Sequence, residues 1–175
     1  MTRHKVFISY YHEDDEEYRN KFENLFGHLF INKSVNEGDI NTERSTEYIK
    51  RIIQKGYISD TSVLVVLVSP KTYCRKHVDW EISAALMKKV GGYSGLLGIC
   101  LPNHPAYGKD GDYNPPNIVP PRLVDNLESG YAKFHDWTEN TNKIKRWIED
   151  AFNAKTNSSH LINNNRPQFK NNRGK

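Results

Sequence analysis

Residues 63–70 read VLVVLVSP, and this stretch decides the fold class of the 175-residue chain. Six consecutive aliphatic residues fit a strand that is covered on both faces, or else a buried helix. The high valine content and the stop formed by Ser69 and Pro70 favour the strand. A strand covered on both faces lies inside a sheet that has helices on each side.

Strands and helices alternate along the rest of the chain. Residues 5–10 (KVFISY) and 95–101 (GLLGICL) predict two further strands, and residues 132–137 predict a weaker one. Residues 103–121 hold five of the eight prolines and predict an extended loop. The alternation predicts an α/β domain with a flavodoxin-like, mostly parallel sheet and helices on both faces. Amphipathic spacing predicts the helices at residues 13–30, 43–54, 76–90 and 140–152.

Positive charge is concentrated at the end of the sequence. The chain has a net charge of +4, and residues 154–175 contain five lysines and arginines and no acid. The other residues therefore carry about one net negative charge, which argues against nucleic-acid binding. Residues 154–175 are also rich in asparagine and poor in apolar residues. We therefore expect one domain over residues 1–153, followed by a basic, disordered tail.

The sequence predicts a cytoplasmic protein without a membrane segment. Its first residues, MTRHKVFISYYHEDD, contain no apolar signal region, and no stretch approaches the roughly 18 apolar residues of a membrane span. Cys74 and Cys100 are too few for a disulfide framework and lack the paired spacing of a zinc site. We expect two reduced thiols and no metal site.

Glu81 is the most informative polar residue of the helix expected at residues 76–90. It falls in the seam between an apolar stripe that faces the sheet and a second apolar patch formed by Trp80, Ala84 and Met87. The side chains one turn ahead are small, so a ligand can approach the carboxylate. A solvated surface glutamate is the alternative interpretation. Phosphate-loop, G-x-G-x-x-G, H-E-x-x-H and G-x-S-x-G motifs are all absent from the sequence.

Two motifs together resemble the Toll/interleukin-1 receptor (TIR) family. Residues 6–16 (VFISYYHEDDE) are similar to the F-I-S-Y-S-H-x-D first strand and loop of that family. The second motif is S-P-x(10)-E, which runs from Ser69 to Glu81. The resemblance covers residues 4–152. The long segment 103–137 looks more specifically like the TIR-like subunit of bacterial Thoeris anti-phage systems.

The resemblance implies an enzyme that cleaves NAD, with Glu81 as the catalytic residue. A carboxylate would stabilise the positive charge that forms on the ribose when nicotinamide leaves. NAD is then the substrate and no cofactor is expected. The product would be a cyclic ADP-ribose type signal nucleotide, sensed by a separate effector protein. The residues expected to bind substrate are Ser9, Tyr10, Tyr11, Ser69, His77 and Trp80.

The sequence also departs from the family pattern. His77 stands four residues before Glu81, where many NAD-cleaving TIR domains have a tryptophan. Residues 36–42 stand where the family has its mobile BB loop, without the usual arginine or proline.

A non-catalytic TIR-like interaction module is the alternative function. In that case Glu81 is a surface residue, and the apolar patch around Trp80 packs against another subunit. Self-association is compatible with both functions, because TIR active sites are often completed by a loop of a neighbouring protomer.

Overall fold

The computed structural model describes residues 2–34, 58–89, 91–109 and 118–173. Within these ranges, five strands form one sheet in the order β2-β1-β3-β4-β5, and every neighbouring pair is parallel. This is the doubly wound order of flavodoxin-like folds, so the predicted fold class is confirmed. The strands are β1 (His4–Ser9), β2 (Phe30–Asn32), β3 (Val63–Val68), β4 (Gly95–Cys100) and β5 (Lys133–Asp136).

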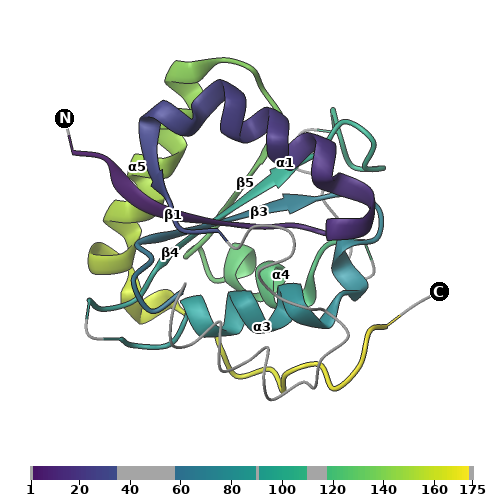
Figure 1. Ribbon diagram of the computed structural model, residues 1–175. Coiled ribbons are helices and arrows are strands. Elements are labelled where there is room, and N and C mark those ends of the chain that lie inside the picture. Colours follow the sequence, from purple (N-terminus) through teal and green to yellow (C-terminus); the bar gives the residue numbers. More distant parts are fainter. Residues whose placement is uncertain (1, 35–57, 90, 110–117, 174–175) are drawn as a thin grey trace.

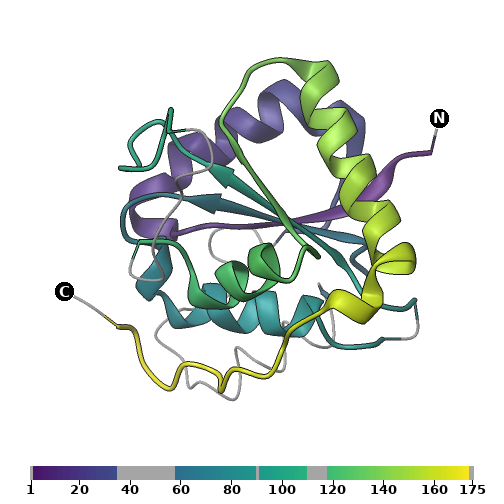
Figure 2. The same cartoon turned by 180° about the vertical axis from the view of Figure 1, so that it is seen from behind.

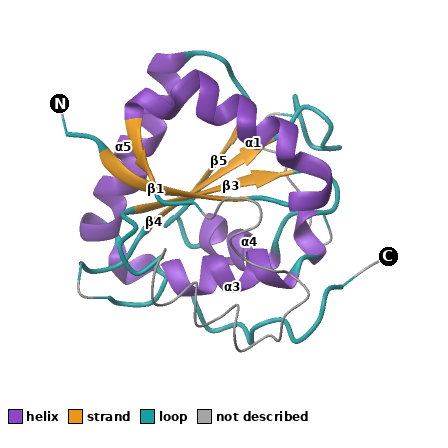
Figure 3. Cartoon of the chain, in the orientation of Figure 1, coloured by secondary structure: helices purple, strands orange, loops and turns teal. Residues whose placement is uncertain are grey.

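Helices cover both faces of the sheet. They are α1 (His12–Phe26), α3 (Lys76–Ala85), α4 (Pro121–Glu128) and α5 (Thr141–Asn157). Helices α1 and α5 lie on one face, and α3 and α4 lie on the other (Figure 1), as the view from behind also shows (Figure 2). Between these layers the strands run side by side through the middle of the molecule (Figure 3).

Strand β3 is the centre of the core. All six of its residues are buried, and it pairs with β1 on one side and β4 on the other. Its odd-numbered residues pack with α1 and α5, whereas its even-numbered residues pack with α3 and α4. The aliphatic run of β3 therefore supplies both hydrophobic layers, as expected for a strand covered on both faces.

Several element boundaries differ from those expected. Helix α1 ends at Phe26, and residues 30–32 form the edge strand β2 in place of further helix. Helix α3 ends at Ala85, and the Lys89 ammonium donates to the carbonyls of Ala84 and Ala85 at that end. The loop and helix expected at residues 36–42 and 43–54 lie outside the described residues.

Helix α4 begins where the sequence predicts only loop. Pro121 occupies its first turn, where a proline has no intrahelical hydrogen bond to lose. The prolines of residues 103–121 therefore mark the start of a helix as well as a loop. Leu123 and Val124 of this helix join the core beneath α3.

The prediction of a disordered tail is wrong. Helix α5 continues past residue 153 to Asn157, and residues 158–173 then run past α4 and along the outside of α3 (Figure 1). We call residues 158–173 the C-terminal strap. Its Phe169 is only 1% exposed, and its backbone bonds to α3. Composition did not predict this order. Hydrogen bonds from asparagine, glutamine and backbone groups, with one buried aromatic side chain, hold the segment in place despite its low apolar content.

No helix in the described ranges is long and apolar enough to cross a membrane.

Helix α5 packs closely on the sheet at Gly95. A Cβ at Gly95 would overlap the backbone carbonyl of Ala151 in α5. We expect Gly95→Ala to lower the free energy of unfolding by about 2–3 kcal/mol, because neither backbone can move without repacking the core. Urea denaturation measures this change. Gly91→Ala is the matched control, because no atom lies within 4 Å of the added Cβ; a similar loss in both variants would contradict the close packing.

Candidate functional site

Glu81 lies in the middle of α3 and is buried, with 6% of its surface exposed. Its carboxyl group interacts with the hydroxyl of Ser9, the last residue of β1. The side chain is therefore at the carboxyl edge of the parallel sheet, where ligands bind in folds of this class. The solvated surface glutamate of the alternative interpretation does not occur.

Two oxygen atoms at this position lack hydrogen-bond partners among the described residues. They are Oε2 of Glu81 and Oγ of Ser9, and both are fully buried. The Ser9 hydroxyl is near enough to lower the pKa of Glu81, but the two groups do not meet in hydrogen-bond geometry. Burying a polar atom without a partner costs roughly 1–3 kcal/mol. The pair is therefore suited to bind a ligand that brings its own donors and acceptors.

Burial controls the charge of Glu81. Removal from water raises the pKa of Glu81 to about 8, and the Ser9 hydroxyl opposes this rise. The carboxyl group is therefore mainly protonated at neutral pH in the unliganded protein. A positively charged ligand beside it would favour the carboxylate form.

His77 lies one helical turn before Glu81 on α3. Its Nε2 bonds to the carbonyl oxygen of Tyr10 at 3.1 Å, which makes this nitrogen the donor. Burial, followed by the nearby His12, lowers the pKa of His77 to about 4, so the ring is neutral at physiological pH. The structure thus places a neutral imidazole next to the buried carboxyl group.

His12 is a site residue that our predictions missed. Its ring stacks on Tyr10 with the centroids 4.3 Å apart, and it meets the edge of His77 at 5.3 Å. These three side chains form a continuous ring cluster at the end of β1. The sequence carried a signal for it, because His12 is the histidine of the first TIR-like motif.

The two tyrosines do not expose their rings. Tyr10 is 1% exposed, and its hydroxyl donates to Glu16 at 2.6 Å. Tyr11 is 8% exposed; its hydroxyl donates to Glu13, and the Arg75 guanidinium lies 4.3 Å from its ring centroid. Both rings shape the wall of the site, and substrate stacking on them would require these contacts to change.

Ser69 has a structural partner. Its hydroxyl donates to Oδ2 of Asp15 at 2.5 Å, and its backbone N–H donates to the Thr72 hydroxyl at 2.8 Å. Both Ser69 and Asp15 are buried, and burial raises the pKa of Asp15 to about 6. Ser69 therefore ties the end of β3 to the first turn of α1, and its hydroxyl is occupied in this structure.

Trp80 does not belong to the site, contrary to our expectation. One helical step of about 100° separates it from Glu81, so it points to the outer side of α3. There it is 2% exposed, and its Nε1 donates to the carbonyl of Phe169 at 2.7 Å. Of the apolar patch proposed for subunit contact, Trp80 is therefore in contact with the strap, whereas Met87 is 40% exposed.

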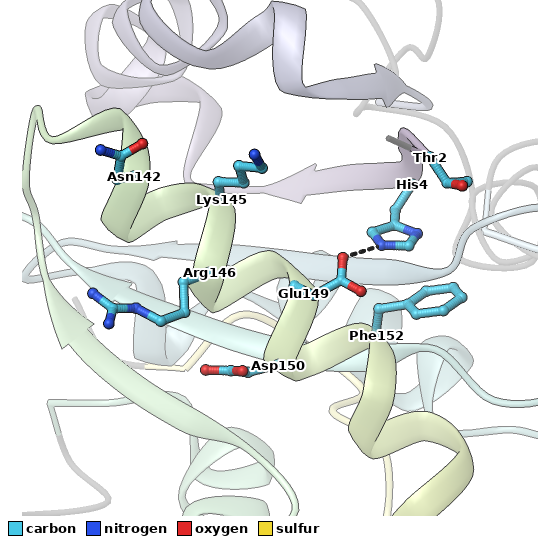
Figure 4. Close-up of a pocket in the computed structure, with 8 residues that line it drawn as sticks. All are labelled: Thr2, His4, Asn142, Lys145, Arg146, Glu149, Asp150 and Phe152. Carbon is cyan, nitrogen blue, oxygen red and sulfur yellow. Dashed lines mark hydrogen bonds and ion pairs between the residues drawn. The ribbon is translucent and has the colours of Figure 1, made fainter.

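Three cavities lined by described residues lie elsewhere. One of about 710 Å³ lies between the start of β1 and α5, at the opposite edge of the sheet from Ser9. Figure 4 shows its lining, in which Glu149 bonds to His4 at 2.6 Å. Two others, of about 270 and 450 Å³, also exclude Glu81. Within the described ranges, no three histidine, cysteine, aspartate or glutamate side chains gather as a metal site.

The raised pKa of Glu81 predicts a pH-dependent stability. The folded state holds this proton more tightly than the unfolded state. The stability that the protonated form contributes is therefore complete below about pH 4.5 and is lost as the pH rises towards about 8. Glu81→Gln cannot lose a proton. We expect its free energy of unfolding to rise relative to wild type by about 1 kcal/mol per pH unit across this range.

Urea denaturation at several pH values measures this difference. The contribution of Asp15 is common to both proteins and cancels. Glu17→Gln, which removes an exposed carboxylate from α1, is the control and should follow wild type at every pH. A constant difference between Glu81→Gln and wild type from pH 5 to 8 would mean that Glu81 is solvated.

Comparison with known proteins gives the family of the chain. The family model described as "Thoeris protein ThsB, TIR-like domain" matches residues 7–106, which is more than half of the chain and includes Ser9, Ser69 and Glu81. Among solved structures, the TIR domains of the activated Roq1 resistosome, which recognises the pathogen effector XopQ, are 15% identical, with a TM-score of 0.42 over 90% of this chain and 86% of that chain. No curated protein matches. This chain belongs to the TIR-like domain family of the Thoeris protein ThsB.

Proposed function

We propose that this TIR-like protein cleaves the bond between nicotinamide and ribose in NAD, with Glu81 as the catalytic residue. The observation that carries the proposal is the buried pair of partnerless oxygens, Oε2 of Glu81 and Oγ of Ser9. Ribose hydroxyl groups donate and accept hydrogen bonds, so bound NAD would satisfy both atoms. The position of the pair at the carboxyl edge of the sheet also fits a nucleotide site.

The proposed reaction needs one anionic group. Nicotinamide leaves as a neutral molecule with both electrons of the C–N bond, and positive charge develops on the ribose carbon and ring oxygen. A carboxylate held beside that carbon stabilises the charge, more strongly in a water-poor site than in bulk water. Glu81, at 6% exposure, would act in such an environment.

The protonation states of the site are compatible with a cationic substrate. The pyridinium ring of NAD is positively charged and would lower the pKa of Glu81 from its unliganded value of about 8. His77, whose pKa lies near 4, brings no competing positive charge. Substrate binding would thus generate the carboxylate that the reaction requires.

Membership of the Thoeris family supports a proposal for the fate of the ADP-ribosyl group. In our proposal, a nucleophilic atom of the same ADP-ribosyl molecule attacks the ribose carbon in place of water and gives a cyclic ADP-ribose type signal nucleotide. A separate effector protein senses it during anti-phage defence. Cyclisation requires water to be excluded while the molecule folds back on itself.

Nicotinamide release tests the role of Glu81. We expect wild type to release nicotinamide from NAD and Glu81→Gln to release it at least about 100-fold more slowly, because the amide keeps the shape of the side chain and removes its charge. Each protein is assayed alone and with filtered lysate from phage-infected cells, since an activating ligand can be needed to populate the competent state. Glu17→Gln is the control and should match wild type.

Equal release by wild type and Glu81→Gln would remove Glu81 from the mechanism. Mass spectrometry of the same reactions identifies the product. A cyclic nucleotide is lighter than ADP-ribose by one water, so a product with the mass of ADP-ribose alone would contradict cyclisation.

The pH dependence of the reaction tests the protonation state. Because the unliganded carboxyl group must lose its proton to act, kcat/KM should rise about tenfold per pH unit below pH 8 and level off above it. Initial rates of nicotinamide release at NAD concentrations well below KM give this profile. A rate that falls with rising pH would indicate that the protonated form is active.

A further inference from the structure

The C-terminal strap contacts helix α3 at three levels along one face. At the start of the helix, Oδ1 of Asn172 accepts the backbone N–H of Lys76 at 3.0 Å. In the middle, Phe169 bonds to two consecutive helix residues, as described below. Further along, Asn164 and Gln168 donate to the carbonyl and hydroxyl of Ser83 at 3.1 and 3.0 Å. The contacted positions follow the spacing of a single helix face.

The first contact supplies a helix cap from a distant part of the chain. Arg75 is the N-cap residue of α3, and its side chain makes no capping bond. Asn172 takes this role from 96 residues further along the sequence. The neighbouring Arg173 N–H donates to the Cys74 carbonyl at 2.7 Å, which fixes the strap next to the start of the helix. The N–H groups of the first turn have no acceptor within the helix, so the N–H of Lys76 needs this partner.

The second contact is built around a buried ion pair. Asp79 is 3% exposed and accepts two hydrogen bonds from Arg122 of α4, at 2.9 and 3.3 Å. The Phe169 N–H completes the set with a bond to Oδ2 of Asp79 at 2.8 Å. The Phe169 carbonyl accepts the indole N–H of Trp80. One strap residue therefore holds the two helix residues that immediately precede Glu81.

Residues 161–166 of the strap pack on the core and bond to α4, whereas the end of the strap, residues 169–173, is attached by few groups. Phe169 is its deeply buried side chain, at 1% exposure, and the Arg173 guanidinium lies 4.0 Å from its ring centroid. Residues 170–172 are exposed apart from the contacts of Asn172. Substitution of Phe169 or Asn172 should therefore loosen the strap while the sheet and its two main hydrophobic layers stay intact.

We propose that the C-terminal strap sets the rotation of α3 about its axis and so holds Glu81 beside Ser9, with Phe169 and Asn172 as positioning residues. The strap forms hydrogen bonds to residues 76, 79, 80 and 83 of α3. Glu81 lies one helical step from Trp80, on the side of the helix that faces β1. A modest rotation of the helix would separate the carboxyl group from Ser9 and admit water. The catalytic consequence rests on the proposed function, whereas the positional one does not.

Five variants of the full chain test the proposal. Asn172→Ala removes the cap acceptor, and Asn171→Ala is its matched control at an exposed neighbouring position. Asn172→Asp keeps an acceptor oxygen and should restore wild-type behaviour. Phe169→Ala removes the buried anchor, and Phe169→Leu keeps an apolar one. Circular dichroism and thermal unfolding confirm that each variant is folded at the assay temperature.

The first readout is independent of catalysis. NMR titration of ¹³C-labelled glutamate side chains, with the Glu81 signal assigned from its loss in Glu81→Gln, gives the midpoint for this carboxyl group. We expect the midpoint to fall by at least about one pH unit in Phe169→Ala and Asn172→Ala, because water reaches the displaced side chain. It should stay near the wild-type value in Asn171→Ala and Asn172→Asp. An unchanged midpoint in folded Phe169→Ala would overturn the proposal.

The second readout is the kinetics of nicotinamide release. Misplacement of the catalytic group should lower kcat about tenfold in Phe169→Ala, with KM within about twofold of wild type, and should move the pH profile to lower pH. A loss of stability alone would leave the pH profile of the folded protein in place. If wild type releases no nicotinamide, the proposed function fails, and the titration still decides whether the strap positions Glu81.

Discussion

The complete burial of β3 is the constraint on which the rest of the structure depends. A strand without any exposed residue requires apolar side chains from helices on both faces, so the chain must cross repeatedly from one side of the sheet to the other. Because neighbouring strands are parallel, the carboxyl ends that precede the helices lie at the same edge of the sheet. Ser9 and the start of the segment that leads into α3 meet there for this reason.

The polar groups at that edge are of two kinds. Asp15, Ser69 and Thr72 bond to one another and join α1 to β3, which compensates the burial of both hydroxyl groups and of Oδ2 of Asp15, whereas Oδ1 of Asp15 is buried without a partner among the described residues. Glu81 and Ser9 are buried without such compensation among the described residues. Proteins commonly keep unfavourable groups of this second kind where a ligand or a reaction makes use of them. This difference supports the role that we propose for Glu81 and Ser9.

The sequence predicted the features that depend on local pattern. The run at residues 63–68 predicted the central strand, the alternation of strands and helices predicted the fold class, and the motifs at residues 6–16 and 69–81 together indicated the family. Side-chain direction was harder, because a single step along α3 separates an inward carboxyl group from the outward Trp80. The composition could not predict the ordered strap, because its order comes from hydrogen bonds to helix residues some 90 positions away.

The long-range cap on α3 has a consequence for the order in which the molecule forms. A helix whose first turn is completed by a residue 96 positions later cannot reach its final state from local interactions alone. Closing such a large loop carries an entropic cost that is recovered only after the surrounding structure has formed. The parallel sheet can therefore assemble before α3, the helix that bears Glu81, receives its cap. The first turn of α3 would then be completed after the sheet has formed.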